Sequence, residues 1–447
     1  MSDDESMDGD DDATHVVTCF LRNGTDVLLC RRSDAVGSYA GRWGGVAGHA
    51  EGDPDALARE EIREETGLLD ACTLVRASDP FSVHDPDHGE WVVHPYLFDC
   101  DSRDAITNEE TAEYEWVPPT AVLDRETVPD LWTSYRRVAP SVESISEDRE
   151  HGSASLSVRA CEVLRDRAAE LAHGVDRDDR DDREPPDDRD ELTALARDLR
   201  DARPSMVVVE NRVNRVLAGA SDAAVPATVA DSASAVLADA LRADSAAAEH
   251  AAAALDGASH VLTLSRSGTV RETLAELDPE RVSVAESRPG GEGVGVAETL
   301  AEECDVTLLP DSAVAHALSG DHVEDDESVD AVLVGADTVL PGGRVVNKVG
   351  TRAALLLADR ESVPAVVVAA RDKVSPHDET DLEPQDPEDV YGGDASLDVL
   401  APTFDVTPAG VATLVTEDGV LAPDEVRAVA REARERGRWD ERIDADE

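Results

Sequence analysis

The stretch GHAEGDPDALAREEIREETGL, residues 48–68, decides the fold of the N-terminal part of the chain. Asp53 followed by Pro54 is typical of a helix start, because an aspartate side chain accepts a hydrogen bond from a free backbone N–H and proline fits the first helical turn. Gly67 is typical of the position just past a helix end. The stretch therefore predicts a helix over residues 54–66.

Three glutamates of this helix share one face. Glu61, Glu64 and Glu65 stand at positions i, i+3 and i+4, which are neighbours on a helix surface. Carboxylates this close repel one another unless a positive charge lies among them. Mg²⁺ or Mn²⁺ would supply it, since both prefer oxygen ligands and also bind phosphate oxygens. The spacing alone leaves two interpretations open, a divalent metal site and a solvated acidic face.

Short β-rich runs surround this helix. Strands are expected at residues 15–21 and 27–30, which are rich in Val, Leu and Cys. Four of the five tryptophans also fall before residue 139: Trp43, Trp91, Trp116 and Trp132. The pattern predicts a separately folded α+β domain over residues 14–138.

The remainder of the chain has a different pattern. Residues 139–255 are rich in Ala and Leu with a helical period, so they predict a helical subdomain. From residue 256 to 436, apolar strands alternate with helical stretches, which predicts a parallel, Rossmann-like sheet wrapped by helices. The strands are expected at 261–264, 282–284, 306–309, 332–334 and 365–368. The predicted fold class is therefore a multidomain α/β protein.

The charge balance is extreme. Asp and Glu total 99 against 41 Lys and Arg, a formal net charge of −58, and only Lys348 and Lys373 are lysines. At molar salt the repulsion reaches only about 3 Å, so acid spread over the whole chain favours a salt-adapted (halophilic) protein. An acidic mimic of nucleic acid is the alternative interpretation. Direct nucleic-acid binding is not expected, because no basic stripe is present.

Targeting and redox features point to the cytoplasm. Residues 1–13 and 437–447 read as acidic tails, and residues 176–190 as an exposed acidic loop within the helical part. The N-terminal tail lacks the apolar core of a signal peptide, and no apolar run approaches the roughly 20 residues of a membrane span. The six cysteines are scattered without a CxxC pair, so neither a zinc site nor a disulfide framework is indicated.

The first domain resembles the Nudix family. The string WGGVAGH at residues 43–49 leads into EIREETGL at 61–68 as in the Nudix box, and residues 113–117 resemble that family's recurring strand. The resemblance implies an α/β/α sandwich that hydrolyses a nucleoside diphosphate linked to another group. The implied metal and catalytic residues are Glu61, Glu64 and Glu65, which would hold Mg²⁺ or Mn²⁺.

The same resemblance implies a fourth carboxylate before Trp116, from either Glu110 or Glu113. The box also departs from the family pattern in two ways. Glu60 stands where an arginine is expected, with Arg59 displaced by one position. The segment before Glu61 is about two residues short and lacks its first glutamate. Hydrolysis and ligand binding without hydrolysis both remain open.

A series of polar, Gly-rich strings follows the predicted strands of the C-terminal half. They are residues 203–205, 263–267, 286–289, 292–293, 311–314, 335–337, 347–351 and 404–408. In an open parallel sheet, ligands gather beyond the carboxyl ends of the strands, and helix N-termini there attract anions. The strings therefore predict a site for a small anionic ligand.

Together and in this order, the strings resemble the family of the initiation factor 2B regulatory subunits, ribose-1,5-bisphosphate isomerase and methylthioribose-1-phosphate isomerase. The resemblance covers residues 150–436 and implies assembly as homodimers or larger oligomers through the Rossmann-like part. It also implies contacts with a sugar phosphate or nucleotide. The implied ligand-binding residues are Arg203, Ser265, Arg288, Asn347 and Lys348.

The isomerases of that family use a cysteine and an aspartate to move protons between neighbouring sugar carbons. Asp337 matches the aspartate as a catalytic residue, but Ser265 stands at the cysteine position. A hydroxyl titrates far above a thiol, so Ser265 is a poor proton shuttle without an activating base. The leading hypothesis is a Mg²⁺-dependent Nudix hydrolase fused to a ligand-sensing, initiation-factor-2B-like module. An aldose–ketose isomerase and a non-enzymatic translation initiation subunit remain alternatives.

Overall fold

The computed structural model describes residues 13–50, 52–148, 151–175, 187–220, 225–319, 328–380, 382 and 384–439. The chain forms two compact units: the first comprises Met1–Ser141 with Arg165–Pro185, and the second comprises Val142–Leu164 with Pro186–Glu447. Residues 1–12, 176–186 and 440–447, which hold most of the predicted tails and acidic loop, lie outside the described residues. Within the predicted loop, a helix begins at Asp188. The predicted domain boundaries stay predictions.

The first unit is built on one mixed sheet of eight strands. The strands are β1 (Thr14–Asn23), β2 (Asp26–Arg32), β3 (Trp43–Gly44), β4 (Val46–His49), β5 (Cys72–Ala77), β6 (Phe81–Asp85), β7 (Gly89–Cys100) and β8 (Thr111–Val117). Their order is β3-β2-β1-β7-β5, with β4 beside β1, β6 beside β7 and β8 beside β2. Only the β1–β7 pair runs parallel among these strands. Two 3₁₀ turns, η1 (Leu69–Ala71) and η2 (Pro119–Asp124), connect elements.

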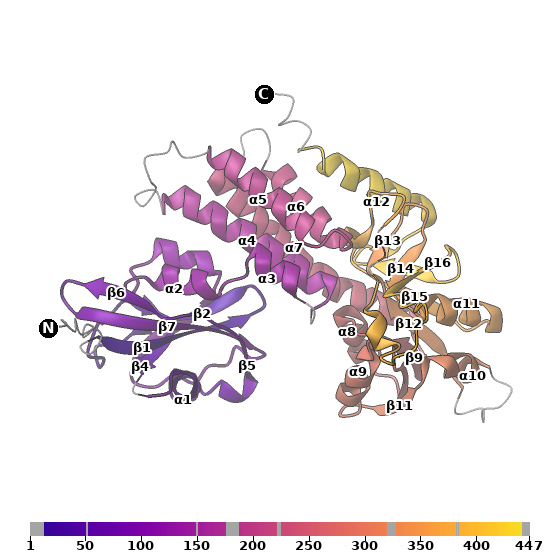
Figure 1. Cartoon of the computed structure of the whole chain (residues 1–447), viewed down its shortest axis with the longest axis horizontal. Coiled ribbons are helices and arrows are strands. Elements are labelled where there is room, and N and C mark those ends of the chain that lie inside the picture. The colour runs from indigo at the N-terminus through magenta and orange to yellow at the C-terminus, as the bar shows by residue number, and fades with distance from the viewer. Residues whose placement is uncertain are drawn as a thin grey trace. The chain divides into compact units, whose positions relative to one another are not determined.

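Helices α1 (Pro54–Thr66) and α2 (Leu131–Val138) lie on opposite faces of this sheet (Figure 1). Alternation along β1 explains the two cores, since Val17 and Cys19 pack with α1 while Phe20 packs with α2. The bounds predicted for α1 are confirmed. The Asp53 side chain accepts a hydrogen bond from the backbone N–H of Asp55, and Gly67 has the left-handed φ of 67° that ends the helix.

A group of helices opens the second unit. They are α3 (Val142–Glu147), α4 (Ser153–His173), α5 (Asp188–Ala202), α6 (Val207–Gly219) and α7 (Pro226–Ala254). Residues 153–164 of α4 belong to the second unit, and the rest of that helix belongs to the first. Within the described ranges, no helix combines the length and the apolarity that a membrane crossing requires.

A sheet of seven strands forms the centre of the second unit. The strands are β9 (His260–Leu264), β10 (Arg281–Ala285), β11 (Asp305–Leu309), β12 (Ala331–Gly335), β15 (Ala365–Val368), β17 (Thr413–Thr416) and β18 (Gly419–Val420). Their order is β11-β10-β9-β12-β15-β17-β18, and only β18 is antiparallel to its neighbour. The parallel sheet and its five predicted strands are confirmed. The strand order reverses between β9 and β12, which is where ligands bind in such sheets.

Helices cover both faces of this sheet (Figure 1). One face packs against α7, α8 (Gly268–Leu277) and α9 (Glu292–Leu300). The other face packs against α10 (Val314–Leu318), α11 (Thr351–Glu361) and α12 (Pro423–Arg436). A small sheet has the order β13 (Thr338–Val339), β14 (Val345–Lys348), β16 (Phe404–Thr407). Among the described residues of this unit, 3₁₀ turns occur at η4 (Asp311–Ala313), η5 (Arg371–Lys373) and η6 (Pro387–Asp389). The predicted α/β fold class is confirmed.

Candidate functional site

The three glutamates of α1 differ in exposure. Glu64 is exposed, Glu61 is half-buried, and Glu65 is buried with only 6% of its surface accessible. Gly48, at the end of β4, packs directly on Glu61. A Cβ atom added at Gly48 would lie 1.8 Å from Glu61 Oε1, which is impossible without movement. Strand β4, which precedes α1, therefore needs a glycine at position 48 to accommodate the Glu61 carboxylate.

Negative charge is concentrated at this face of α1. Burial, together with the charges of Glu61 and Glu110, raises the pKa of Glu65 to about 8. Burial and the neighbouring Glu64 likewise raise the pKa of Glu61, with Glu110 contributing after them. The positive charge of Arg32 acts in the opposite direction on Glu65. The carboxylates thus share a partly desolvated site that carries more negative than positive charge.

The structure separates the two candidates for a fourth carboxylate. Glu113 lies on β8, where its Oε1 accepts a hydrogen bond from Arg31 Nη1 at 2.8 Å. Glu110 lies just before β8, and its charge acts on both Glu61 and Glu65. The geometry therefore favours Glu110 over Glu113 as the carboxylate that joins the glutamates of α1.

Arginines near the site are arranged differently from the family pattern. The guanidinium of Arg59 lies 5.9 Å from the centroid of the Phe98 ring. Arg32, at the end of β2, supplies the positive charge that acts on Glu65, and its Nε donates to the Ser38 carbonyl at 3.0 Å. Sequence reasoning missed Arg32, because its place beside α1 depends on strand pairing that no local pattern reveals.

A divalent metal fits the chemistry of these donors. Among the described residues, no group of three or more His, Cys, Asp or Glu side chains is already arranged to hold an ion. However, the pKa of Glu65 is raised by burial and then by its acidic neighbours, and a divalent cation would relieve the repulsion among these carboxylates. Hard oxygen donors of this kind suit Mg²⁺ or Mn²⁺. The side chains that would hold the ion stay the predicted Glu61, Glu64 and Glu65, and Glu110 lies close enough to Glu61 and Glu65 to join them.

In the second unit, the loops after β9 and β12 meet where the strand order reverses. A Cβ atom at Gly335, the last residue of β12, would lie 3.0 Å from Ser267 Oγ, so the two loops are in close contact. Ser265 has a left-handed φ of 60°. Its backbone N–H donates to Ser287 Oγ at 2.7 Å, which ties it to the loop after β10. The structure thus places the predicted Ser265 at this edge of the sheet.

Asp337 follows β12 at the same edge. Its half-buried carboxylate accepts a hydrogen bond from Ser153 Oγ at 3.3 Å. Burial raises the pKa of Asp337, and the positive charges of Lys373 and Lys348 partly oppose that rise. Both lysines of the chain therefore lie close enough to Asp337 to affect its charge.

The two lysines are held firmly. Lys348 is 5% exposed and Lys373 is 7% exposed. Lys373 Nζ donates to the Ala336 carbonyl at 2.6 Å. Lys348 Nζ donates to Glu292 Oε1 at 2.6 Å, and the other oxygen of Glu292 is buried with no hydrogen-bond partner. Lys373 and Glu292 complete the site although sequence reasoning assigned them no role. The rarity of lysine in this chain was the one available signal for Lys373.

Asn347 and its neighbours have internal partners. The side-chain amide of Asn347 donates to Thr351 Oγ1 at 2.9 Å. The carboxylate of Asp405 accepts hydrogen bonds from the backbone N–H groups of Gly350 and Arg352, which caps the start of α11. The N-terminus of α11 is therefore already satisfied by a carboxylate of the chain.

The two predicted arginine contacts lie in different surroundings. Arg288 Nε donates to Glu286 at 3.2 Å from an exposed side chain, and its backbone N–H donates to Asp311 at 2.7 Å. Arg203 is buried, and its Nη1 donates to the carbonyl of Asp148, at 2.7 Å, beyond the C-terminus of α3. The ligand contacts of both arginines stay predictions.

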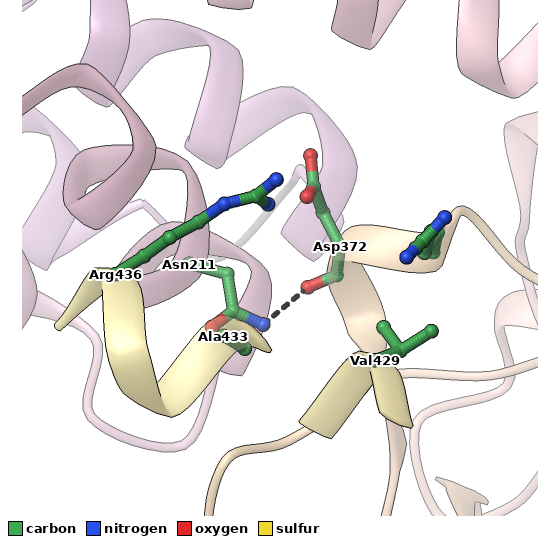
Figure 2. A pocket seen from close by; sticks show the side chains of 6 residues that line it. Asn211, Asp372, Val429, Ala433 and Arg436 are labelled. Carbon is green, nitrogen blue, oxygen red and sulfur yellow. Dashed lines mark hydrogen bonds between the residues drawn. The ribbon is translucent and has the colours of Figure 1, made fainter. Parts of the chain in front are cut away.

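A small cavity lies elsewhere in the second unit (Figure 2). It is lined by Asn211, Arg371, Asp372, Val429, Ala433 and Arg436. Asn211 Nδ2 donates to the carbonyls of Asp372 and Val374, at 2.7 and 2.9 Å, while its Oδ1 is buried without a partner. The cavity volume of about 10 Å³ is enough for roughly one water molecule. The cavity is too small for a substrate.

Comparison with known proteins identifies both units. Residues 149–423 match the model of the initiation factor 2 subunit family. The chain belongs to this family. Residues 13–138 match the NUDIX domain model. The two resemblances read from the sequence are thereby confirmed, and the NUDIX match contains the glutamates of α1 together with Glu110 and Glu113.

Two relatives of the part that matches the initiation factor 2 subunit family are isomerases. The chain is 33% identical over 172 residues to the methylthioribose-1-phosphate isomerase of Nostoc punctiforme, covering 36% of this chain and 47% of that protein. It is 29% identical over 238 residues to the ribose 1,5-bisphosphate isomerase of Methanocaldococcus jannaschii, covering 50% of this chain and 74% of that protein. The chain thus spans about half the length of the first relatives that it matches.

Solved structures of the family share the fold. A translation initiation factor eIF-2B from Pyrococcus horikoshii matches with a TM-score of 0.50 and 21% identity, over 62% of this chain and 94% of that chain. A 5-methylthioribose 1-phosphate isomerase from the same organism matches with a TM-score of 0.51 and 19% identity, over 72% and 89%. At this level of identity, the similarity concerns the fold alone.

Proposed function

We propose that the NUDIX unit is a divalent-metal-dependent hydrolase of a diphosphate linked to a nucleoside or a related group. The observation that carries the proposal is Glu65 beside Glu61 and Glu110, where burial and then the charges of these two glutamates raise the pKa of Glu65. When bound, Mg²⁺ would neutralise the diphosphate and activate the attacking water. Burial of Glu65 keeps bulk water away and strengthens the attraction between the carboxylates and the ion.

Each residue has a distinct proposed part. Gly48 gives Glu61 the room to turn its carboxylate toward the site. Arg32 lowers the pKa of Glu65 and so opposes part of the rise that burial and the neighbouring carboxylates cause. Glu64, exposed on the same face, is available to accept a proton from the attacking water.

Hydrolysis assays test this proposal. A panel of nucleoside diphosphate-linked compounds would be incubated with the full chain and Mg²⁺ at high salt. We expect release of phosphate or a nucleoside monophosphate, lost on Glu64→Gln. The matched control is Glu60→Gln, which removes an exposed carboxylate from the same helix. Magnesium uptake by calorimetry without turnover of any compound would instead support a unit that only binds its ligand.

A second candidate function belongs to the other unit. We propose that it binds a sugar phosphate, and the supporting observation is the convergence of Lys348 and Lys373 on Asp337 where the strand order reverses. Its relatives include a ribose 1,5-bisphosphate isomerase. A carboxyl group with a raised pKa can exchange a proton with a neighbouring sugar carbon. Ser265 lacks the acidity of a thiol. The residue type at position 265 therefore determines whether the ligand is converted or only bound.

Incubation with ribose 1,5-bisphosphate separates isomerisation from binding. Formation of a ketose product that is lost on Asp337→Asn indicates catalysis. Absence of product in the native chain, with a gain on Ser265→Cys, shows that only the thiol is missing. Ligand binding with no conversion in either form, together with co-purification of an initiation factor, favours the non-enzymatic subunit.

Assembly and salt adaptation are also proposals. We propose that the chain forms dimers or larger oligomers through residues 256–436 and is most stable at high salt. The net charge of −58 supports the second point, because screening shortens its self-repulsion. Sedimentation velocity in molar and in dilute KCl measures assembly, and thermal unfolding in the same buffers measures stability. A monomer in every condition, with a melting temperature independent of salt, would contradict them.

A further inference from the structure

We propose that the NUDIX unit acts on a ribose 5-phosphate that carries a diphosphate on C1, and that the resulting ribose 1,5-bisphosphate is the ligand of the second unit. This inference rests on both proposed functions. It specifies the group attached to the diphosphate, and it states why one chain would hold both units.

The reaction balances without any co-substrate except water. Water attacks the terminal phosphorus of the C1 diphosphate, and the bond from that phosphorus to the bridging oxygen breaks. The bridging oxygen stays on the phosphate that remains attached to C1. The products are ribose 1,5-bisphosphate, inorganic phosphate and a proton. No electron transfer occurs, so the site needs only the carboxylates and the divalent ion already proposed.

The position of the diphosphate on the sugar determines whether the two units can share a compound. If a diphosphate joins a nucleoside to C5 of ribose, hydrolysis leaves ribose 5-phosphate with a free hydroxyl on C1. Such a product lacks the C1 phosphate of ribose 1,5-bisphosphate. When the diphosphate is on C1 of a ribose 5-phosphate, hydrolysis leaves phosphates on both C1 and C5. Only this second class of substrate yields the proposed ligand of the second unit directly.

The second unit is suited to such a doubly charged product. A chain with 99 acidic residues has only two lysines, and both are buried beside Asp337. An ammonium is a compact point charge that suits phosphate oxygens. Helix α8 begins at Gly268, directly after the β9 loop, and its N-terminus adds a partial positive charge at the same edge of the sheet. A doubly charged product would thus meet positive groups at the edge of the sheet that holds Asp337.

Glu292 currently neutralises one of these groups. Its Oε1 lies 2.6 Å from Lys348 Nζ, and its buried Oε2 has no partner. A phosphate oxygen entering the site would take the place of this carboxylate on Lys348. Moving away would cost Glu292 its ion pair with Lys348, but it would let the buried, unpartnered Oε2 reach water. The geometry therefore points to an anionic group as the ligand that Lys348 receives.

Phosphorus NMR tests the inference on the full chain at high salt with Mg²⁺. The substrates are 5-phosphoribosyl 1-diphosphate and, in a parallel arm, ADP-ribose. With Asp337→Asn, which blocks further conversion, we expect inorganic phosphate and ribose 1,5-bisphosphate in equal amounts. We expect kcat/KM for 5-phosphoribosyl 1-diphosphate to exceed that for ADP-ribose by at least tenfold. Glu64→Gln should abolish release, whereas Glu60→Gln should retain it.

The outcomes separate the inference from the functions on which it rests. Hydrolysis of ADP-ribose alone, or with the higher kcat/KM, overturns the inference and leaves the hydrolase intact. Release of inorganic diphosphate, which would mean cleavage at C1, also overturns it. If neither compound reacts, the hydrolase proposal fails as well. Calorimetry with ribose 1,5-bisphosphate completes the test, since Lys348→Met should weaken binding at least tenfold, and equal affinity would overturn the second half of the inference.

Discussion

Lys348 Nζ lies 2.6 Å from Glu292 Oε1, so the lysine proposed to receive a phosphate already contacts a carboxylate. Glu292 is the first residue of α9, which follows β10 by a short loop. It stands near a helix N-terminus, where a negative charge is stabilised. Glu292 therefore competes with any anionic ligand for Lys348, because both would bind the same ammonium group.

Replacing Glu292 by Gln should strengthen ligand binding. The amide cannot neutralise Lys348, so an incoming phosphate no longer displaces a charge. We expect the Kd for ribose 1,5-bisphosphate, measured by calorimetry, to fall about tenfold, which corresponds to about 1.4 kcal/mol. Glu298→Gln is the matched control, since Glu298 is an exposed carboxylate of the same helix. Unchanged or weaker binding in Glu292→Gln would show that Glu292 contacts the ligand favourably or not at all.

Replacing Gly48 by Ala should disable the NUDIX site without unfolding the unit. The new Cβ would lie 1.8 Å from Glu61 Oε1, so the carboxylate has to move away from its present position. We expect Mg²⁺-dependent hydrolysis to drop at least tenfold, while the circular dichroism spectrum stays unchanged. Gly37→Ala is the control, because a Cβ atom at Gly37 meets nothing within 4 Å. Full activity in Gly48→Ala would mean that Glu61 has no part in the reaction.

The raised pKa of Glu65 predicts how stability depends on pH when divalent ions are removed. Its ordinary value of 4.5 rises to about 8 in the folded unit, so the folded state binds this proton more tightly than the unfolded chain does. The stability that Glu65 contributes is therefore fully present below about pH 4.5, and it is lost as the pH rises toward 8. Each pKa unit corresponds to about 1.4 kcal/mol, which gives a change of a few kcal/mol.

Urea unfolding in EDTA measures this effect. Tryptophan fluorescence reports mainly on the first unit, which contains four of the five tryptophans. Between pH 5 and 8, the decrease in unfolding free energy should be smaller in Glu65→Gln than in the native chain, and Glu60→Gln should retain the native decrease. Mg²⁺ should reduce the native decrease, since it stabilises the ionised carboxylate. Parallel curves for the native chain and Glu65→Gln would contradict the assigned charge state.

Local signals explain which parts of the structure could be predicted. The bounds of α1 follow from Asp53 and Pro54 at its start and from Gly67 at its end. Each of these residues stabilises the helix end at which it stands, so no distant partner is needed. The five strands predicted for the second unit are short apolar runs between helical stretches, so their positions and parallel direction also follow from the sequence, whereas β17 and β18 were not predicted. The switch point at β9 and β12 then places Ser265 and Asp337 at one edge.

Long-range pairing explains what could not be predicted. Arg32 reaches Glu65 only because β2 lies in the same sheet that α1 covers, and Glu292 reaches Lys348 across separate elements. Lys373 lies beside Asp337 because η5 follows β15, the strand next to β12. In each case the charge of the residue is visible in the sequence, but its partner depends on which strands are neighbours.

Asn211 holds the backbone on both sides of Lys373, so its loss should affect stability and ligand binding together. Its Nδ2 donates to the carbonyls of Asp372 and Val374. Asn211→Ala leaves these two acceptors without a donor, at a cost of about 1–3 kcal/mol each when they stay buried. Hydrogen exchange at the Lys373 and Val374 amides should accelerate, and the affinity for ribose 1,5-bisphosphate should fall several-fold. Ser234→Ala, an exposed change on α7, should alter neither quantity. Faster exchange with unchanged affinity would separate Lys373 from the ligand site, because the loosened turn would then have no effect on binding.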